Sequence, residues 1–177
     1  RLSLHYSTLA ERHVPVLQRL EQPLFHLNIF GAGHVGQSVV NALYDVPCTI
    51  RWIDERADIF PVAVPVKTTV CVCDLPEDEV ADCQPGDFYL VMTHSHARDL
   101  EIVSQILTRA DAGYVGLIGS RTKRVRFERQ LRQRALNPAT IHCPIGQESC
   151  VGKEPWRIAL SVANDLADRG QITHLIT

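Results

Sequence analysis

Short apolar runs alternate along most of the chain with segments whose apolar residues recur at helical spacing. The apolar runs, rich in β-branched and aromatic residues, predict buried strands over residues 24–30, 48–54, 67–73, 87–93 and 114–118. The helical spacing predicts helices over about residues 34–44, 97–110, 121–135 and 155–166. Because strands and helices alternate, we predict a doubly wound α/β fold in three layers, a parallel sheet with helices on both faces.

The remaining segments lack a regular period. Residues 1–23 are mixed and interrupted by prolines, so we expect a short irregular lead-in, which could be the remnant of a preceding domain, before one domain over residues 24–177. Prolines also argue against a regular helix over residues 57–66. We expect the acidic segment 75–79 to begin a short helix, and residues 141–146 to be irregular or a short strand.

The first predicted strand ends in a glycine pattern that reads Gly31-Ala-Gly33-His34-Val35-Gly36. In the strand-to-helix turn of a dinucleotide-binding fold, the first glycine allows the tight turn and the second lets the backbone approach a pyrophosphate. The third lets the following helix pack closely on the sheet. We therefore expect a Rossmann-like domain that binds an anion through backbone N–H groups of this turn. An ordinary glycine-rich turn of an α/β protein is the alternative.

The second predicted strand ends at Asp54, where a ribose-binding acid is expected about 20 residues past the glycines. We expect the Asp54 carboxylate to accept hydrogen bonds from a ribose or from another polar group of a ligand. Arg51 and Arg56 are its neighbours in sequence, so a plain ion pair is the alternative.

Composition excludes several kinds of partner, cellular location and metal site. The 177 residues carry a formal net charge of −2, so no overall positive charge favours nucleic acid as a partner. No run of about 18 apolar residues and no secretory signal occurs, so we expect neither a membrane span nor export. Six cysteines without a Cys-x-x-Cys pair argue against a structural zinc site and favour the reducing cytoplasm. Cys71 and Cys73 share one face of a predicted strand and are interpreted as small buried residues.

Polar residues follow the fourth predicted strand over residues 93–99. Ligands of open α/β sheets lie beyond the carboxyl ends of the strands, so we expect this segment to donate hydrogen bonds to a ligand. The residues expected to do so are Thr93, His94, Ser95 and His96. The histidines could instead ligate a metal, but Arg98 stands where an acidic ligand would be needed, and its charge opposes a metal. A further alternative is that Asp99 mainly caps the next helix.

A basic helix start follows the fifth predicted strand. Ser120 is well placed to cap this helix. Cations are unfavourable at a helix N-terminus because the helix dipole is positive there, so their presence favours a bound anion. The residues expected to hold that anion are Gly119, Ser120, Arg121 and Lys123. A solvated basic face is the alternative, and it is our interpretation of the arginines further along the helix.

A last candidate segment joins Cys143-Pro-Ile-Gly146 to the sequence Gly152-Lys153-Glu-Pro155. Pro155 suits the first position of a helix, so Lys153 would lie at the helix mouth, either binding an anion or serving as a surface lysine. Cys143 could handle sulfur, but we favour a packed thiol.

In their order along the chain and in their amino-acid sequences, these segments resemble the XdhC/CoxI family of xanthine dehydrogenase accessory proteins. The resemblance runs from about Leu24 to Leu166, and the segments that carry it are Phe30–Gly36, Trp52–Arg56, Val91–His96, Tyr114–Arg124, Cys143–Gly146 and Gly152–Pro155. It implies the Rossmann-like carboxyl-terminal domain of a molybdenum cofactor chaperone, rather than an enzyme. The smaller amino-terminal domain of the family is not recognisable in this sequence.

The resemblance also implies what the domain does. Family members hold molybdopterin cofactor, protect it while a cysteine desulfurase adds sulfur, and deliver it to an apo-enzyme of the xanthine dehydrogenase type. We expect the glycine turn and the basic helix start to hold the anionic end of the cofactor. His94 and His96 would meet polar pterin or molybdenum-oxo atoms, because the fourth and fifth strands should flank the first. We also expect a cytoplasmic homodimer that binds neither nucleic acid nor membrane.

Two other functions suit the same glycine pocket. An NAD(P)-dependent oxidoreductase would use the glycines and Asp54 similarly, but it needs a second region for its substrate, and few residues remain to build one. A nucleotide-sensing or interaction module would bind a ligand without any chemistry.

Overall fold

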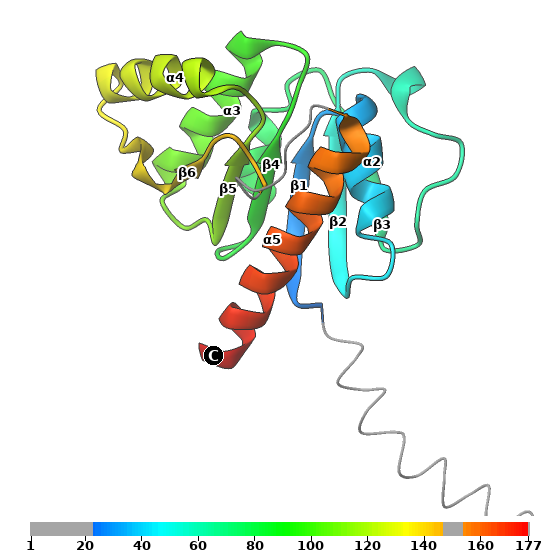
Figure 1. The fold of residues 1–177 in the computed structure, drawn as a ribbon. Helices are drawn as coiled ribbons and strands as arrows, with labels where there is room; N and C mark the ends of the chain where they lie inside the picture. Colours follow the sequence, from blue (N-terminus) through cyan, green and yellow to red (C-terminus); the bar gives the residue numbers. More distant parts are fainter. Residues whose placement is uncertain (1–22, 147–153, 177) are drawn as a thin grey trace, which may run out of the picture.

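The computed structural model describes residues 23–146 and 154–176 (Figure 1). The strands are β1 (Phe25–Phe30), β2 (Cys48–Asp54), β3 (Thr68–Val72), β4 (Phe88–Val91), β5 (Tyr114–Leu117) and β6 (Ile141–His142). The α-helices are α2 (His34–Ala42), α3 (His96–Arg109), α4 (Arg121–Gln133) and α5 (Pro155–Ile176). Short 3₁₀ helices are η1 (Ala57–Ile59), η2 (Asp78–Asp82) and η3 (Pro138–Thr140). Of the expected lead-in, residues 1–22 lie outside the described part.

The strands form one parallel sheet in the order β3-β2-β1-β4-β5-β6. This is the order of a doubly wound dinucleotide-binding sheet, which reverses direction beside its first strand. The predicted Rossmann-like α/β fold is therefore confirmed. The expectation that β5 would flank β1 is wrong, because β2 and β4 flank β1 and β5 lies one strand further. The hydrophobic pattern alone does not specify strand order.

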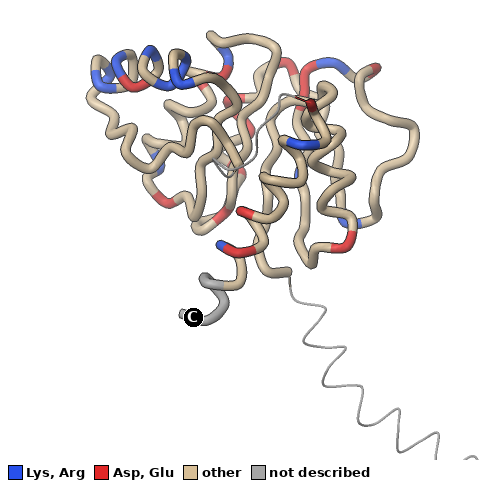
Figure 2. The backbone as a smooth tube through the Cα atoms, viewed as in Figure 1, with Lys and Arg blue, Asp and Glu red and all other residues tan. Residues whose placement is uncertain are grey.

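Basic residues gather on α4, where Figure 2 shows a run of Lys and Arg along the helix. Only Phe127 and Leu131 of α4 are buried, and both pack against the sheet. Apart from the exposed Val125, the rest of the helix surface carries polar and charged side chains. Among the described residues, no helix is long and apolar enough to cross a membrane.

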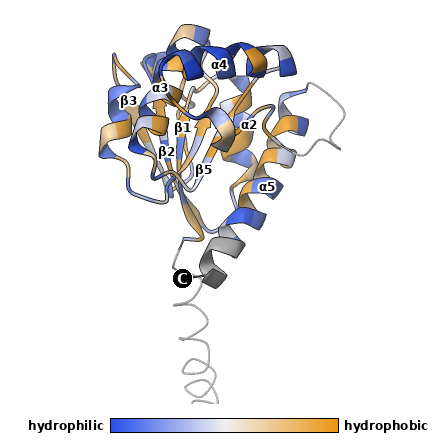
Figure 3. Ribbon diagram, turned by 90° about the vertical axis from the view of Figure 1, so that its left-hand side faces the viewer, coloured by the Kyte–Doolittle hydropathy of each residue, from blue (hydrophilic) through white to orange (hydrophobic). Residues whose placement is uncertain are grey.

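Each face of the sheet carries its own apolar core, visible as orange segments between strands and helices in Figure 3. On one face, Val39 of α2 and Val162 of α5 pack in a cluster with Leu27 and Trp52 of the strands. On the other face, α3 and α4 supply the apolar side chains Ile102, Val103, Ile106, Phe127 and Leu131. The strands are sandwiched between these layers, which explains why they are apolar on both faces.

The structure departs from the sequence prediction in two segments. The acidic helix expected from residue 75 is the 3₁₀ helix η2 over Asp78–Asp82. The last helix does not end near residue 166 but continues to Ile176. An i,i+4 ion pair, with the Arg169 Nε 2.9 Å from the Asp165 Oδ1, stabilises the helix where the sequence prediction ended it.

Candidate functional site

Four candidate segments lie at the carboxyl edge of the sheet, because the strands that precede them run parallel (Figure 1). The glycine turn 31–36 follows β1, and segments 54–56 and 93–99 follow its two neighbours, β2 and β4. The basic segment 118–124 follows β5, one strand further from the glycine turn. The turns after β1, β2 and β4 are therefore adjacent, and the start of α4 borders them.

Two glycines of the turn are required by close backbone contacts. Gly31 has a φ of +116°, and a Cβ there would lie 2.4 Å from the carbonyl oxygen of Met92. A Cβ on Gly36 would lie 2.3 Å from the carbonyl oxygen of Gly31. The same oxygen accepts a hydrogen bond of 3.1 Å from the indole N–H of Trp52. These contacts fix the turn against both neighbouring strands.

Gly33 is a glycine for a different reason. No atom lies within 4 Å of a Cβ built on Gly33, and its φ of −67° and ψ of −175° suit any residue. Gly33 is the N-cap of α2, and no side chain caps this helix. The first N–H groups of a helix have no partner within the helix, so those of His34, Val35 and Gly36 are available at its mouth. Open space beside backbone donors is suited to an anion.

Asp54 ties the glycine turn to the end of β2. It is only 4% exposed, and its Oδ2 accepts a hydrogen bond of 2.7 Å from the N–H of Ala32. Its Oδ1 accepts a hydrogen bond from the N–H of Arg56 at 3.0 Å, and the guanidinium of Arg56 contacts both oxygens at 2.9 and 3.0 Å. The ion-pair alternative is thus present with Arg56, while Arg51 pairs with Glu79 instead. A ligand that binds the Asp54 carboxylate must compete with Arg56.

Asp54 makes a pH-dependent contribution to stability. Burial acts to raise its pKa, but the hydrogen bonds from Arg56 and Ala32 outweigh it and hold the pKa below the usual carboxyl value. A lowered folded-state pKa gives stability that is present above the unfolded value of about 4 and is lost as pH falls through the folded pKa. We expect Asp54→Asn to lower the free energy of unfolding by about 1–2 kcal/mol at pH 7, and by less near pH 3.

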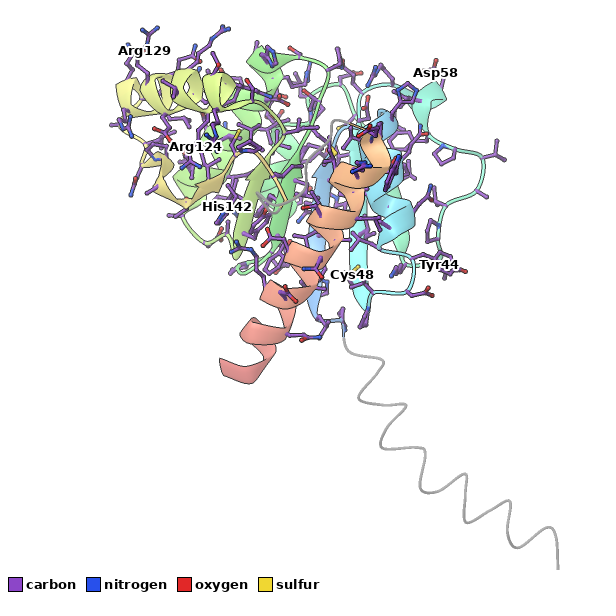
Figure 4. All side chains as sticks on the ribbon, viewed as in Figure 1. Tyr44, Cys48, Asp58, Arg124, Arg129 and His142 are labelled. Atoms are coloured by element: carbon purple, nitrogen blue, oxygen red, sulfur yellow. The ribbon has the colours of Figure 1, made fainter. Side chains whose placement is uncertain are left out.

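Urea unfolding at both pH values measures this difference. Asp58→Asn is the matched control, because Asp58 lies exposed on η1 near the same loop (Figure 4) and should change stability little at either pH. An Asp54→Asn difference that is the same at pH 7 and pH 3 would contradict the role assigned to the ionised carboxylate.

A charged cluster lies next to the glycine turn, beyond β2 and β4. Two side chains lie within ion-pairing distance of Glu55: the His94 Nε2 is 3.4 Å from the Glu55 Oε1, and the Arg98 Nη2 is 2.9 Å from the Glu55 Oε2. Arg98 also reaches Glu77, with an Nη1 to Oε2 distance of 3.1 Å. Sequence reasoning missed Glu55 and Glu77, because nothing local connects them to Arg98.

The cluster borders a small hollow that opens at the carboxyl edge. Its lining residues are Ile53, Asp54, Glu55, Pro76, Thr93, His94 and Arg98. Two predicted site residues, Thr93 and His94, therefore line the same hollow as Asp54. His96 is exposed in the first turn of α3, and the Ser95 hydroxyl caps that helix by accepting from the N–H of Arg98. The alternative that Asp99 is the main cap of this helix is wrong.

Asp99 instead forms a buried ion pair with Lys123. The Lys123 Nζ lies 2.6 Å from the Asp99 Oδ2 and 2.7 Å from the carbonyl oxygen of Ile118. The other oxygen of Asp99 accepts from the Thr93 N–H at 3.0 Å and from the Thr93 hydroxyl at 2.7 Å. Asp99 is 0% and the Lys123 side chain 9% exposed, so the lysine charge is neutralised internally. Lys123 therefore connects the turns after β4 and β5, and in this structure its ammonium faces Asp99 and the Ile118 carbonyl oxygen rather than solvent.

Ser120 caps the start of α4, as the sequence predicted. The Ser120 hydroxyl accepts from the N–H of Lys123 at 3.2 Å, directly after Gly119 with its φ of +158°. Arg121 is exposed in the first turn and borders an open hollow along the outer side of α4, which extends to Arg129. Figure 4 shows Arg129 projecting away from the sheet. The basic residues beyond the first turn are therefore a solvated face.

Cys143 is a packed thiol. It is 3% exposed, and burial raises the pKa of its thiol above the usual value. Its carbonyl oxygen accepts a hydrogen bond of 3.1 Å from Arg124, whose side chain runs from α4 toward the sheet. Both observations favour a packed Cys143 thiol over one that handles sulfur. Lys153 lies outside the described residues, so its predicted position at the mouth of α5 stays a prediction.

Comparison with known sequences gives a family match over most of the chain. A family model described as the XdhC Rossmann domain matches residues 27–166. The uncharacterized protein YqeB of Escherichia coli K12 is 29% identical over 147 residues, which cover 79% of this chain and 26% of YqeB. The chain thus spans about a quarter of that relative.

Comparison with solved structures gives the same fold. A crystal structure described as a xanthine dehydrogenase from Bacillus halodurans superposes with a TM-score of 0.71 at 26% identity, covering 84% of this chain and 43% of that one. A Rossmann-fold NAD(P)-binding family protein from Shigella flexneri superposes with a TM-score of 0.53 at 16% identity, covering 84% of this chain and 87% of that one. At 16% identity the second similarity shows the fold alone.

Proposed function

Because this chain belongs to the family of XdhC Rossmann domains, we propose that it binds molybdenum cofactor at the carboxyl edge of its sheet. The proposed role is that of an accessory protein. It would hold molybdopterin while a cysteine desulfurase sulfurates the cofactor, and then assist its insertion into an apo-enzyme of the xanthine dehydrogenase type. A cytoplasmic homodimer is part of this proposal.

The observation that carries the proposal is the uncapped N-terminus of α2 at Gly33, which has open space beside it. Molybdopterin ends in a phosphate, and an anion of that kind needs backbone donors and space for close approach. The glycine turn offers both, since no side chain caps α2 and no atom lies within 4 Å of a Cβ on Gly33. The residues present therefore fit the anionic end of the cofactor. When bound, the cofactor would supply the redox chemistry of its client enzyme.

The surrounding residues have separable roles in this proposal. Gly33 to Gly36 would bind the phosphate, and Asp54 would keep the turn in its binding conformation through Ala32. Thr93 and His94 line the adjacent hollow and would meet polar atoms of the pterin. Lys123 and Asp99 would hold the Thr93 backbone in place without touching the ligand.

The arrangement around Asp54 is our reason for proposing molybdopterin ahead of NAD(P). In a typical NAD site, an acid at the end of the second strand binds the ribose hydroxyls. Here both Asp54 oxygens already accept hydrogen bonds from Arg56, and one of them also holds Ala32. An NAD(P)-dependent oxidoreductase or a nucleotide-sensing module remains the alternative that the ligand test separates.

The test is to identify the ligand that leaves the protein. The chain is purified from a host that makes molybdenum cofactor and is denatured in acid, and the released material is oxidised and separated. We expect a fluorescent oxidised pterin in proportion to protein. Release of NAD(P) without pterin, or of no ligand from protein loaded with cofactor, would overturn the proposal.

Charge reversal on α4 tests whether the basic helix start belongs to the same site. Arg121→Glu places a negative charge at the border of the site, so we expect retained pterin to fall by about tenfold or more. Arg132→Glu is the control, because Arg132 lies far along the same helix and pairs with Glu128 at 3.2 Å. Equal losses in both variants would indicate a diffuse basic surface instead of a site.

A further inference from the structure

Two thiols and a carboxylate stand together beside the edge strand of the sheet. Cys71 lies on β3 and Cys73 directly follows it, while Glu79 comes from η2. The thiols share one face, as the sequence predicted, but both are half-buried rather than buried. Their sulfur atoms and a Glu79 carboxylate oxygen all lie within 4.8 Å of one another. The Cys71 Sγ is 3.4 Å from the Glu79 Oε2.

The spacing of these donor atoms is close to that of a tetrahedral metal site. Zinc binds thiolate sulfur at about 2.3 Å and carboxylate oxygen at about 2.0–2.2 Å, which places donor atoms about 3.4–3.8 Å apart in a tetrahedron. Small side-chain rotations would bring the three donors to these distances. Thiolates select soft or borderline metals such as zinc, and not magnesium or calcium.

The charges near the cluster also suit a divalent cation. Arg51 of β2 donates to the Glu79 carboxylate, and its Nη1 donates to the Glu79 carbonyl oxygen at 3.0 Å. If both thiols release their protons to solvent, two thiolates, the Glu79 carboxylate and the Arg51 guanidinium carry a net charge of −2. A divalent cation neutralises this charge. Arg51 would then orient the ligating carboxylate, as outer partners of metal ligands commonly do.

We propose that Cys71, Cys73 and Glu79 form a binding site for a divalent metal of the zinc class. Three protein ligands leave one position of a tetrahedron to solvent, which the half-buried state of the ligands allows. The site is separate from the glycine turn, and the proposal does not depend on the bound cofactor. Sequence reasoning missed it because Cys-x-Cys on a strand is not a usual zinc spacing, and the third ligand comes from a different element.

The experiment uses the full chain, freed of metal, with cobalt(II) as the spectroscopic probe. We expect one cobalt ion per chain, with thiolate-to-cobalt charge transfer in the near ultraviolet and the strong visible bands of tetrahedral cobalt. Zinc should displace the cobalt and raise the thermal midpoint of unfolding. We expect Cys71→Ser and Cys73→Ser each to lose the charge-transfer band, and Glu79→Gln to weaken affinity by about tenfold or more.

Cys48→Ala is the matched control, because Cys48 is a buried thiol on β2 in the opposite core and should leave cobalt binding unchanged. Circular dichroism confirms that each variant is folded. Folded wild-type protein that shows no thiolate-to-cobalt band would overturn the site. So would a band that persists unchanged in both Cys71→Ser and Cys73→Ser.

Discussion

Replacing Gly33 with valine is expected to abolish ligand retention while the protein stays folded. The backbone at Gly33 already has a conformation that valine adopts, and no atom lies within 4 Å of the new Cβ. The branched side chain would instead occupy the space that an anion needs in front of the N–H groups of α2. We expect retained pterin to fall to background, with a stability change within about 1 kcal/mol.

Gly36→Val is the contrasting variant, because its Cβ would lie 2.3 Å from the Gly31 carbonyl oxygen. We expect this contact to lower the free energy of unfolding by about 3 kcal/mol or more. Urea unfolding and pterin fluorescence, measured on the same preparations, separate the two effects. Full pterin retention in folded Gly33→Val protein would show that the ligand does not approach this turn.

Replacing Lys123 with methionine is expected to lower the free energy of unfolding by about 3–5 kcal/mol. The substitution keeps much of the side-chain volume but leaves the carboxylate of Asp99 buried without its cation, with 0% of that residue exposed. It also removes the donor to the Ile118 carbonyl oxygen at 2.7 Å. Such a loss would show that Lys123 has a structural role through its buried ion pair with Asp99.

The double variant Lys123→Met, Asp99→Asn tests the cause of that loss. Asparagine keeps an oxygen to accept from Thr93 but carries no charge, so we expect the double variant to be more stable than Lys123→Met alone. Urea unfolding of the wild type, Lys123→Met, Asp99→Asn and the double variant gives the double-mutant cycle. A loss below about 1 kcal/mol in Lys123→Met would contradict the buried pair and restore the lysine as a candidate anion ligand.

Local sequence patterns predicted most of the elements because they depend on short-range sterics. Within residues 23–146 and 154–176, the apolar runs matched the longer strands, and the α-helices began within a residue of the prediction. The glycine turn was recognisable because its constraints act within a few residues: Gly36 must clear the Gly31 carbonyl, and Gly33 must leave the helix mouth open. Ser120 as the cap of α4 was predictable for the same reason, since it bonds the N–H of Lys123 in the next turn.

The partners of the charged residues could not be predicted in the same way. Glu55 and Arg98 meet because β2 and β4 both flank β1, and Lys123 reaches Asp99 because β5 is next to β4. The third member of the thiol cluster comes from η2, on a separate element from Cys71 and Cys73. These residues are far apart along the chain, and their contacts depend on strand order.

The sequence by itself therefore determined the α/β class, the strand-turn-helix unit with its glycines, and the family. Each of these depends on residues that are close along the chain or on the order of whole motifs. Only the tertiary structure decided that Asp54 pairs with Arg56, that Lys123 is buried against Asp99, and that two thiols face a carboxylate. The physical reason is that a charged or thiol side chain pairs with the group that the packed sheet and helices place next to it. Burial makes the pairing necessary, because an unpaired buried charge or polar group costs free energy.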